Sequence, residues 1–135
     1  MKEYKLKNNT IVTKQDLVDV LNWCKKYVGR SKYFPIKKLK LRINTRIKFL
    51  GEFGVYQNTI YINPENHDNF LHLVETVIHE YIHFRQNPKE YDRLSRNYNF
   101  ENYFDHPHEQ EAELLAVTLG KIYYKTLKNG KINAR

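Results

Sequence analysis

The segment from about residue 69 to residue 86 constrains the fold of this chain more than any other. Its apolar residues point to nearly every side of a helix: Phe70, Leu71, Leu73, Val74, Val77, Ile78, Tyr81 and Ile82. Asn87-Pro88 follows directly and predicts the end of the helix. A helix that is apolar around most of its girth must be covered by other elements. We therefore expect this helix to lie at the centre of the fold.

Two further helices are predicted on either side of the central one in the sequence. Apolar residues recur at helical spacing over about 14–28, where Thr13 and Asp16 suit the first turn and Gly29 suits the stop. Pro107 suits the first turn of a last helix over about 107–128, which is expected to stop at Asn129-Gly130.

A small sheet is predicted between the first helix and the central helix, over about 38–63. Apolar and polar residues alternate along 39–43, and shorter strand-like runs occupy 47–49, 53–57 and 59–63. Residues 88–106 lose periodicity and predict a lid that is a loop or a short helix. The expected class is α+β, with a mainly antiparallel sheet of about three strands packed on the central helix.

The size and composition of the chain are those of one soluble domain. The 135 residues are 41% hydrophobic, which is enough for one core spanning 1–135. No run approaches the roughly 20 apolar residues of a membrane helix, and residues 1–10 are polar without a signal-peptide core. We therefore expect a cytoplasmic protein with no membrane partner. Cys24 is the only cysteine, so a metal site must use His, Asp or Glu.

Positive charge is concentrated in residues 25–48, here called the basic segment. The formal net charge is +8, yet no acidic residue lies between Asp19 and Glu52, while ten lysines and arginines do. Such a segment could attract nucleic acid or an acidic protein through long-range steering. It could equally be the solvated face of a helix and a strand.

The central helix carries the sequence His79-Glu80-Tyr81-Ile82-His83, which has the His-Glu-x-x-His pattern. Residues four apart lie on one helix face, so the two imidazoles can bind one zinc ion at about 2.0–2.1 Å. Glu80 projects to another side and suits a general base that takes a proton from water at the metal. The pattern predicts one zinc ion per chain, with His79 and His83 as ligands and Glu80 as the catalytic residue.

A third ligand is expected from the start of the last helix. The inward stripe of that helix is predicted to run through Leu115, Thr118, Leu119 and Ile122. Four residues before Leu115 this stripe reaches Glu111, which is the preferred third ligand, with His108 as the alternative. Glu109 and Glu113 are expected on flanking faces as solvated acids.

The two motifs resemble those of the gluzincins, a class of zincin-type zinc metallopeptidases. In these the third ligand is a Glu directly before an Ala, as in Glu111-Ala112. The order of helix, small sheet, motif helix and glutamate helix is similar to the minimal domains of the ImmA/IrrE and SprT-like groups. SprT-like proteins usually take a His as third ligand, here His106 or His108, and ImmA/IrrE proteins usually continue with Asn where this chain has Glu113.

The resemblance implies hydrolysis of a peptide bond in a protein or peptide substrate. The oxyanion that forms would need a donor besides the metal, and Tyr91, Tyr98, Tyr103, His106 or His108 could supply it. An edge strand at 59–63 could pair with an extended substrate. The alternative is a nucleic-acid or protein-binding module that uses the basic segment and has a structural or degenerate metal site. Metal-assisted hydrolysis of another bond ranks last, because no phosphate-cradling glycine loop is visible.

Overall fold

The structure is a computed structural model that describes residues 1–129. It contains four helices and two small sheets and is about 53% helical, which confirms the α+β class. The helices are α1 (Lys14–Tyr27), α2 (Phe70–Arg85), α3 (Pro88–Ser95) and α4 (Pro107–Lys128). The strands are β1 (Glu3–Lys5), β2 (Ile11–Thr13), β3 (Lys40–Ile43), β4 (Gly51–Gly54) and β5 (Thr59–Ile62).

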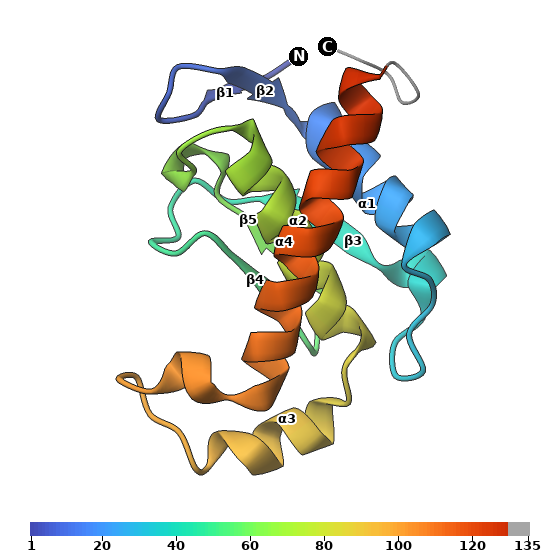
Figure 1. The fold of residues 1–135 in the computed structure, drawn as a ribbon, viewed down its shortest axis with the longest axis vertical. Coiled ribbons are helices and arrows are strands. Elements are labelled where there is room, and N and C mark those ends of the chain that lie inside the picture. The colour runs from blue at the N-terminus through green and yellow to red at the C-terminus, as the bar shows by residue number, and fades with distance from the viewer. Residues whose placement is uncertain (130–135) are drawn as a thin grey trace.

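Helix α2 is the central element, as its apolar girth predicts. It packs against α4, α1 and strands β4 and β5, and α4 lies across the front of it in Figure 1. The Asn69 side chain accepts a hydrogen bond from the backbone N–H of His72 and so caps the first turn. Ten of the 16 residues of α2 are buried, because neighbours cover it on several sides.

Helix α1 has the start and stop that the sequence predicts. Thr13 and Asp16 form a capping box, in which the Thr13 backbone N–H donates to the Asp16 carboxylate at 2.8 Å. At the other end Gly29 has φ of 99°, a conformation that L side chains rarely adopt, and its N–H donates to the Cys24 carbonyl. The expected stop of α4 at Asn129-Gly130 is described only as far as Asn129, because Gly130 lies outside the described residues.

The larger sheet has the order β3-β5-β4, with β5 in the centre. Strand β5 pairs with β4 in antiparallel fashion and with β3 in parallel fashion. The expectation that residues 59–63 form an edge strand is therefore wrong: both sides of β5 are paired, and the edge strands are β3 and β4. The chain leaves β3, crosses to the far edge as β4 and returns to the middle.

Residues 47–49 are not a strand, in contrast to the prediction. The side-chain amide of Asn63 donates to the carbonyl of Ile47 at 2.9 Å, and that of Asn66 donates to the carbonyls of Lys48 and Phe49. Because these carbonyls are satisfied by amide side chains, this stretch forms the crossover loop between β3 and β4.

A two-stranded antiparallel sheet of β1 and β2 precedes α1, where the sequence pattern predicts no strand. Leu6 and Val12 are almost fully buried, and Asn9 occupies the turn with φ of 71°. Because residues 1–10 are polar and rich in lysine, their hydropathy does not show the alternation of exposed and buried side chains along these short strands. The pair of asparagines at the turn, Asn8 and Asn9, was the available indication.

Candidate metal centre

The two histidines of α2 converge on one point, as their spacing predicts. The Nε2 atoms of His79 and His83 lie 3.2 Å apart, and their rings are 4.9 Å apart between centroids. Both side chains are mostly buried, at 16% and 12% exposed. Two imidazole nitrogens this close gain little from each other, but both can direct a lone pair to one cation.

Glu109 is the third side chain that reaches the point where His79 and His83 converge. Its Oε1 lies 3.1 Å from the Nε2 atoms of both His79 and His83. Ligand atoms held by tetrahedral zinc at about 2.0–2.1 Å lie about 3.3 Å apart, so this triangle has nearly the size that such an ion requires. His79, His83 and Glu109 could therefore hold a metal ion.

The expectation that Glu111 is the third ligand is corrected by this geometry. The buried stripe of α4 runs through Glu109, Ala112, Ala116, Gly120 and Tyr123, one position away from the predicted stripe. Small residues let α4 approach α2 closely but carry little hydropathy, so the apolar pattern of the sequence points instead to larger residues that are half-buried or exposed. Glu111 is exposed, and its Oε1 accepts a hydrogen bond from Gln86 Nε2 at 2.9 Å.

The ionisation of Glu109 and His83 is coupled. Burial acts to raise the pKa of Glu109, but hydrogen bonds from His79 and His83 outweigh it and hold that pKa well below its usual range. Burial acts to lower the pKa of His83, but the hydrogen bond with Glu109 and the nearby Glu80 charge raise it above its ordinary value. In this arrangement Glu109 is therefore a carboxylate. A proton and a metal cation would compete for Nε2 of His83.

Each histidine has a second partner on its other ring nitrogen. Nδ1 of His83 lies 2.6 Å from Gln86 Oε1, and Nδ1 of His79 lies 3.3 Å from Glu113 Oε2. Since these oxygens can only accept, each Nδ1 carries a hydrogen. Each Nε2 would then be free to bind a cation once it loses the proton that it donates to Glu109. Gln86 was not considered from the sequence, and Glu113 was expected to be a solvated acid.

Two tyrosines hold the other oxygen of Glu109. The Tyr103 hydroxyl donates to Oε2 at 2.6 Å, and the Tyr91 hydroxyl donates to the same oxygen. Tyr91 comes from α3 and Tyr103 from the 3₁₀ turn Tyr103–Asp105, so the predicted lid over 88–106 supplies both. Burial and the hydrogen bonds to Glu109 raise the pKa of both phenols, which therefore remain donors.

Glu80 lies beside the group on α2 and is only 7% exposed. Burial raises the pKa of its carboxyl, and the neighbouring His83 and His79 offset part of this rise. The backbone N–H of Phe53, in the edge strand β4, donates to it. The carboxyl thus faces the cleft with a proton affinity above that of an ordinary glutamate.

The remaining histidines of the prediction point elsewhere. His106 is buried at the start of α4, where its Nδ1 accepts from the backbone N–H of His108 and its Nε2 lies 3.1 Å from the Tyr91 carbonyl. Nε2 of His108 lies 3.3 Å from Glu90 on α3. The structure thus brings Tyr103 to the group, whereas His106 and His108 join the lid to α4.

A cleft of about 850 Å³ opens onto the candidate metal centre. Its walls come from β4 and the loop before it, from α2 and α4, and from the lid, and His79, Glu80, His83 and Glu109 all line it. The edge strand β4 forms one wall, so an extended chain could lie along it beside His79, His83 and Glu109.

Comparison with protein-family models, curated proteins and solved structures finds no match to this chain. The class that the fold and site define is therefore an α+β protein with a candidate metal centre of two histidines and one glutamate. Among the described residues, no helix is both long enough and apolar enough to cross a membrane.

Proposed function

We propose that this protein is a zinc-dependent peptidase of the His-Glu-x-x-His type. The observation that carries the proposal is the triangle of His79, His83 and Glu109 with the buried Glu80 beside it, at one wall of an open cleft. Two imidazoles and one carboxylate suit zinc, and three protein ligands leave a position for water or substrate.

In the proposed hydrolysis, the metal ion and Glu80 would have separate roles. His79, His83 and Glu109 would hold the zinc ion, which would lower the pKa of a water molecule and polarise the carbonyl group of the substrate. Glu80 would accept a proton on a carboxylate oxygen as the oxygen of the water attacks the peptide carbonyl carbon. It would then donate that proton to the amide nitrogen as the C–N bond breaks. A raised pKa makes the Glu80 carboxylate a stronger base for accepting this proton.

Tyr103 is the donor that we assign to the developing oxyanion. Its hydroxyl lies in the cleft and already donates to Glu109, so a small rotation could redirect it to a substrate oxygen. Tyr91 and Gln86 keep the carboxylate and His83 in place.

The test is the metal content of the purified protein together with cleavage of an unfolded protein substrate. We expect about one zinc per chain, cleavage that stops with a chelator and returns with zinc, and no cleavage by Glu80→Gln despite normal zinc content. If Glu80→Gln cleaves as fast as the wild type, the proposal is wrong.

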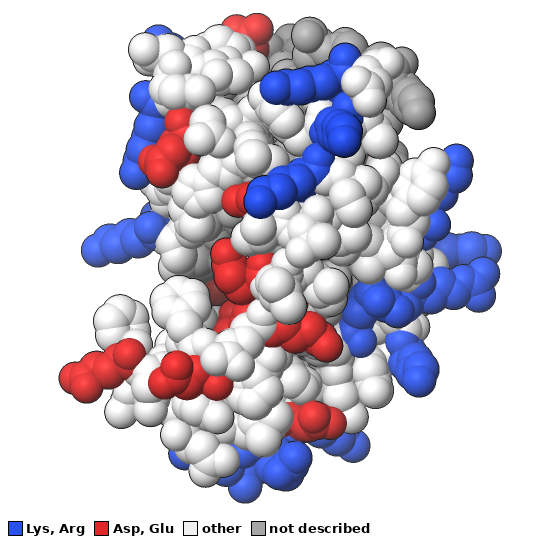
Figure 2. Space-filling model, in the orientation of Figure 1, with Lys and Arg blue, Asp and Glu red and all other residues white. Residues whose placement is uncertain are grey.

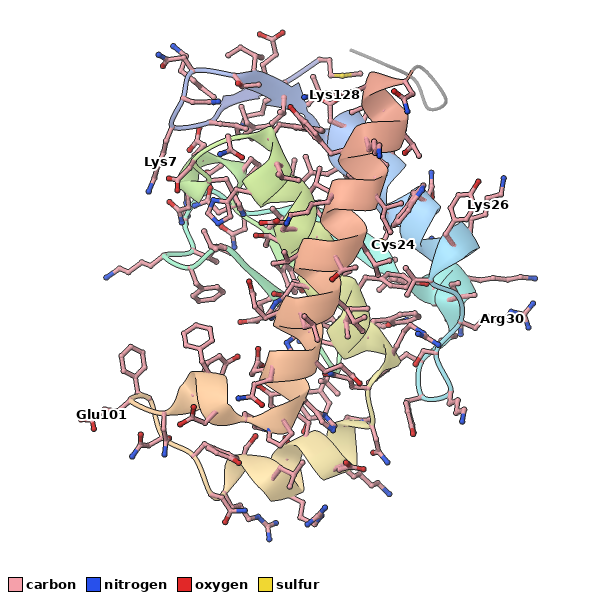
Figure 3. All side chains as sticks on the ribbon, viewed as in Figure 1. Lys7, Cys24, Lys26, Arg30, Glu101 and Lys128 are labelled. Carbon is pink, nitrogen blue, oxygen red and sulfur yellow. The ribbon has the colours of Figure 1, made fainter. Side chains whose placement is uncertain are left out.

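A second candidate function uses the basic segment. Nine of its ten lysines and arginines are exposed, and none of the ten lines the cleft. Lys26 and Arg30 project from the right edge in Figure 3, far from Glu101 at the lower left. Binding of nucleic acid or an acidic protein there would leave the cleft open. Its test is the loss of binding when Lys37, Lys38, Lys40 and Arg42 are neutralised, while Glu80→Gln keeps it.

A further inference from the structure

The charge of the cleft is opposite to that of the protein. Seven of the 15 acidic residues line it, and none of the lysines and arginines in the described part of the chain does. Glu80 and Glu109 belong to the candidate metal centre, and five other acids remain: Glu52, Glu75, Asp92, Glu101 and Glu113. Figure 2 shows Asp and Glu gathering in the hollow of this face, whereas Lys and Arg lie mostly around its periphery.

These five acids come from several elements around the candidate metal centre. Glu52 lies on the edge strand β4, Glu75 and Glu113 lie on α2 and α4, and Asp92 and Glu101 lie in the lid. Glu75 and Glu113 are close enough for the charge of Glu113 to raise the pKa of Glu75, after burial as the larger cause. One divalent cation at the centre would offset two of the seven negative charges and leave the cleft strongly negative.

Apolar side chains form both lips of the same cleft. Phe49, Leu50 and Val55 flank β4, and Phe100, Tyr103 and Phe104 belong to the lid. Phe100 is 98% exposed and Phe104 is 70% exposed. Water-exposed phenyl rings at the mouth of a cleft gain free energy when a ligand covers them.

We propose that the cleft binds an extended peptide segment in which lysine or arginine side chains are mixed with bulky apolar ones. This inference rests on the proposed function and names its substrate class. The backbone of the segment would lie along β4, its cationic side chains would meet the acids, and its apolar side chains would cover the lips. Acidic segments and nucleic acid would be repelled from the cleft by the same charges.

The net charge of the protein alone predicts the opposite preference, for acidic peptides. A chain with a net charge of +8 attracts acidic peptides by non-specific steering. A preference for basic peptides therefore has the opposite sign and must come from a local acidic site.

Binding is measured with zinc-loaded Glu80→Gln, so that the probe is not cleaved. The probes are three labelled peptides of equal length, with Leu and Phe at the same positions and Lys, Gln or Glu at the others. We expect the Lys peptide to bind about tenfold more tightly than the Gln peptide at low salt and the Glu peptide to bind most weakly, with the differences shrinking as salt rises. Replacement of Leu and Phe by Ala should weaken binding of the Lys peptide by about tenfold or more.

A matched pair of double variants locates the effect, each in the same Glu80→Gln background. Glu52→Gln with Glu101→Gln should weaken binding of the Lys peptide by about three- to tenfold and leave the Gln peptide unchanged. Glu3→Gln with Glu65→Gln removes the same charge from exposed positions outside the cleft and should change neither. Equal affinities for the Lys and Glu peptides, or an equal effect of both double variants, would overturn the proposal.

Cleavage by the wild type separates this inference from the proposed function. Cleavage of all three peptides at equal rates would overturn the charge preference and leave the peptidase intact. No cleavage of any peptide by the zinc-loaded protein would overturn the peptidase, and the binding measurement would still decide the preference of the cleft.

Discussion

The side-chain oxygen of Gln86 lies 2.6 Å from Nδ1 of His83, directly beyond the end of α2. The amide nitrogen of Gln86 donates to the carbonyl of His108 at 2.8 Å and to Glu111 at 2.9 Å. This buried glutamine thus connects α2 to the start of α4 and fixes a hydrogen of His83 on Nδ1.

Gln86→Met should lower zinc affinity by about 10- to 100-fold, because His83 loses the acceptor that orients it. Gln86→Glu keeps an acceptor at this position and should retain most of the affinity. Competition against a chromophoric chelator measures both, and circular dichroism checks that the helices remain. Equal affinity of Gln86→Met and the wild type would contradict the positioning role.

Glu109→Gln should abolish stoichiometric zinc binding, whereas Glu111→Gln should retain about one zinc per chain. The first change removes the charge that lies 3.1 Å from both imidazoles, while the second affects an exposed residue that contacts only Gln86 in the described hydrogen-bond network. Elemental analysis of both purified variants measures the difference. Retention of zinc by Glu109→Gln and its loss from Glu111→Gln would restore the original prediction from the sequence.

Tyr103→Phe should lower kcat by about 100-fold with little change in zinc content, if this hydroxyl stabilises the oxyanion as proposed. Tyr91 still donates to Oε2 of Glu109 in this variant, so the ligand stays oriented. Steady-state kinetics and metal analysis of the same preparation provide the test. An unchanged kcat would remove Tyr103 from the mechanism.

His67 should make the protein less stable in mild acid. It is fully buried, its Nδ1 lies 2.9 Å from the carbonyl oxygen of Asn63, and its Nε2 lies 2.8 Å from the hydroxyl oxygen of Thr76. Burial, with a smaller contribution from the nearby His72, lowers the pKa of His67 to about 4. Between that value and about 6.5 the unfolded chain binds a proton that the folded chain does not.

The free energy of unfolding should therefore fall by about 3 kcal/mol from this residue as the pH falls from about 7 to 4. Urea titrations across this range measure it, with His67→Asn as the control, because Asn does not titrate there. The variant should be less stable than the wild type at neutral pH and should lose less stability on acidification. Parallel pH profiles for the two proteins would contradict this account.

Local patterns predicted the elements of this fold well. Helices α1, α2 and α4 begin and end within one residue of the bounds predicted from apolar spacing, Thr13, Asn87-Pro88 and Pro107, as far as the structure describes them. The convergence of His79 and His83 followed from their spacing alone, since residues four apart on a helix must share a face. The loop at residues 47–49 did not follow, because it depends on hydrogen bonds from Asn63 and Asn66, which lie about 15 to 20 positions further along the chain. The strand order did not follow either, because it depends on the pairing of β5 with two strands that are distant from each other in sequence.

The sequence by itself determined the α+β class, the central helix and the paired imidazoles, because each depends on residues within a few turns of one another. Only the tertiary structure decided that Glu109 rather than Glu111 joins them. That choice depends on the rotation of α4 about its own axis, and close packing against α2 through Ala112, Ala116 and Gly120 sets this rotation. The same packing turns Glu111 toward Gln86 and Glu113 toward His79, so one helix orientation places all three acids.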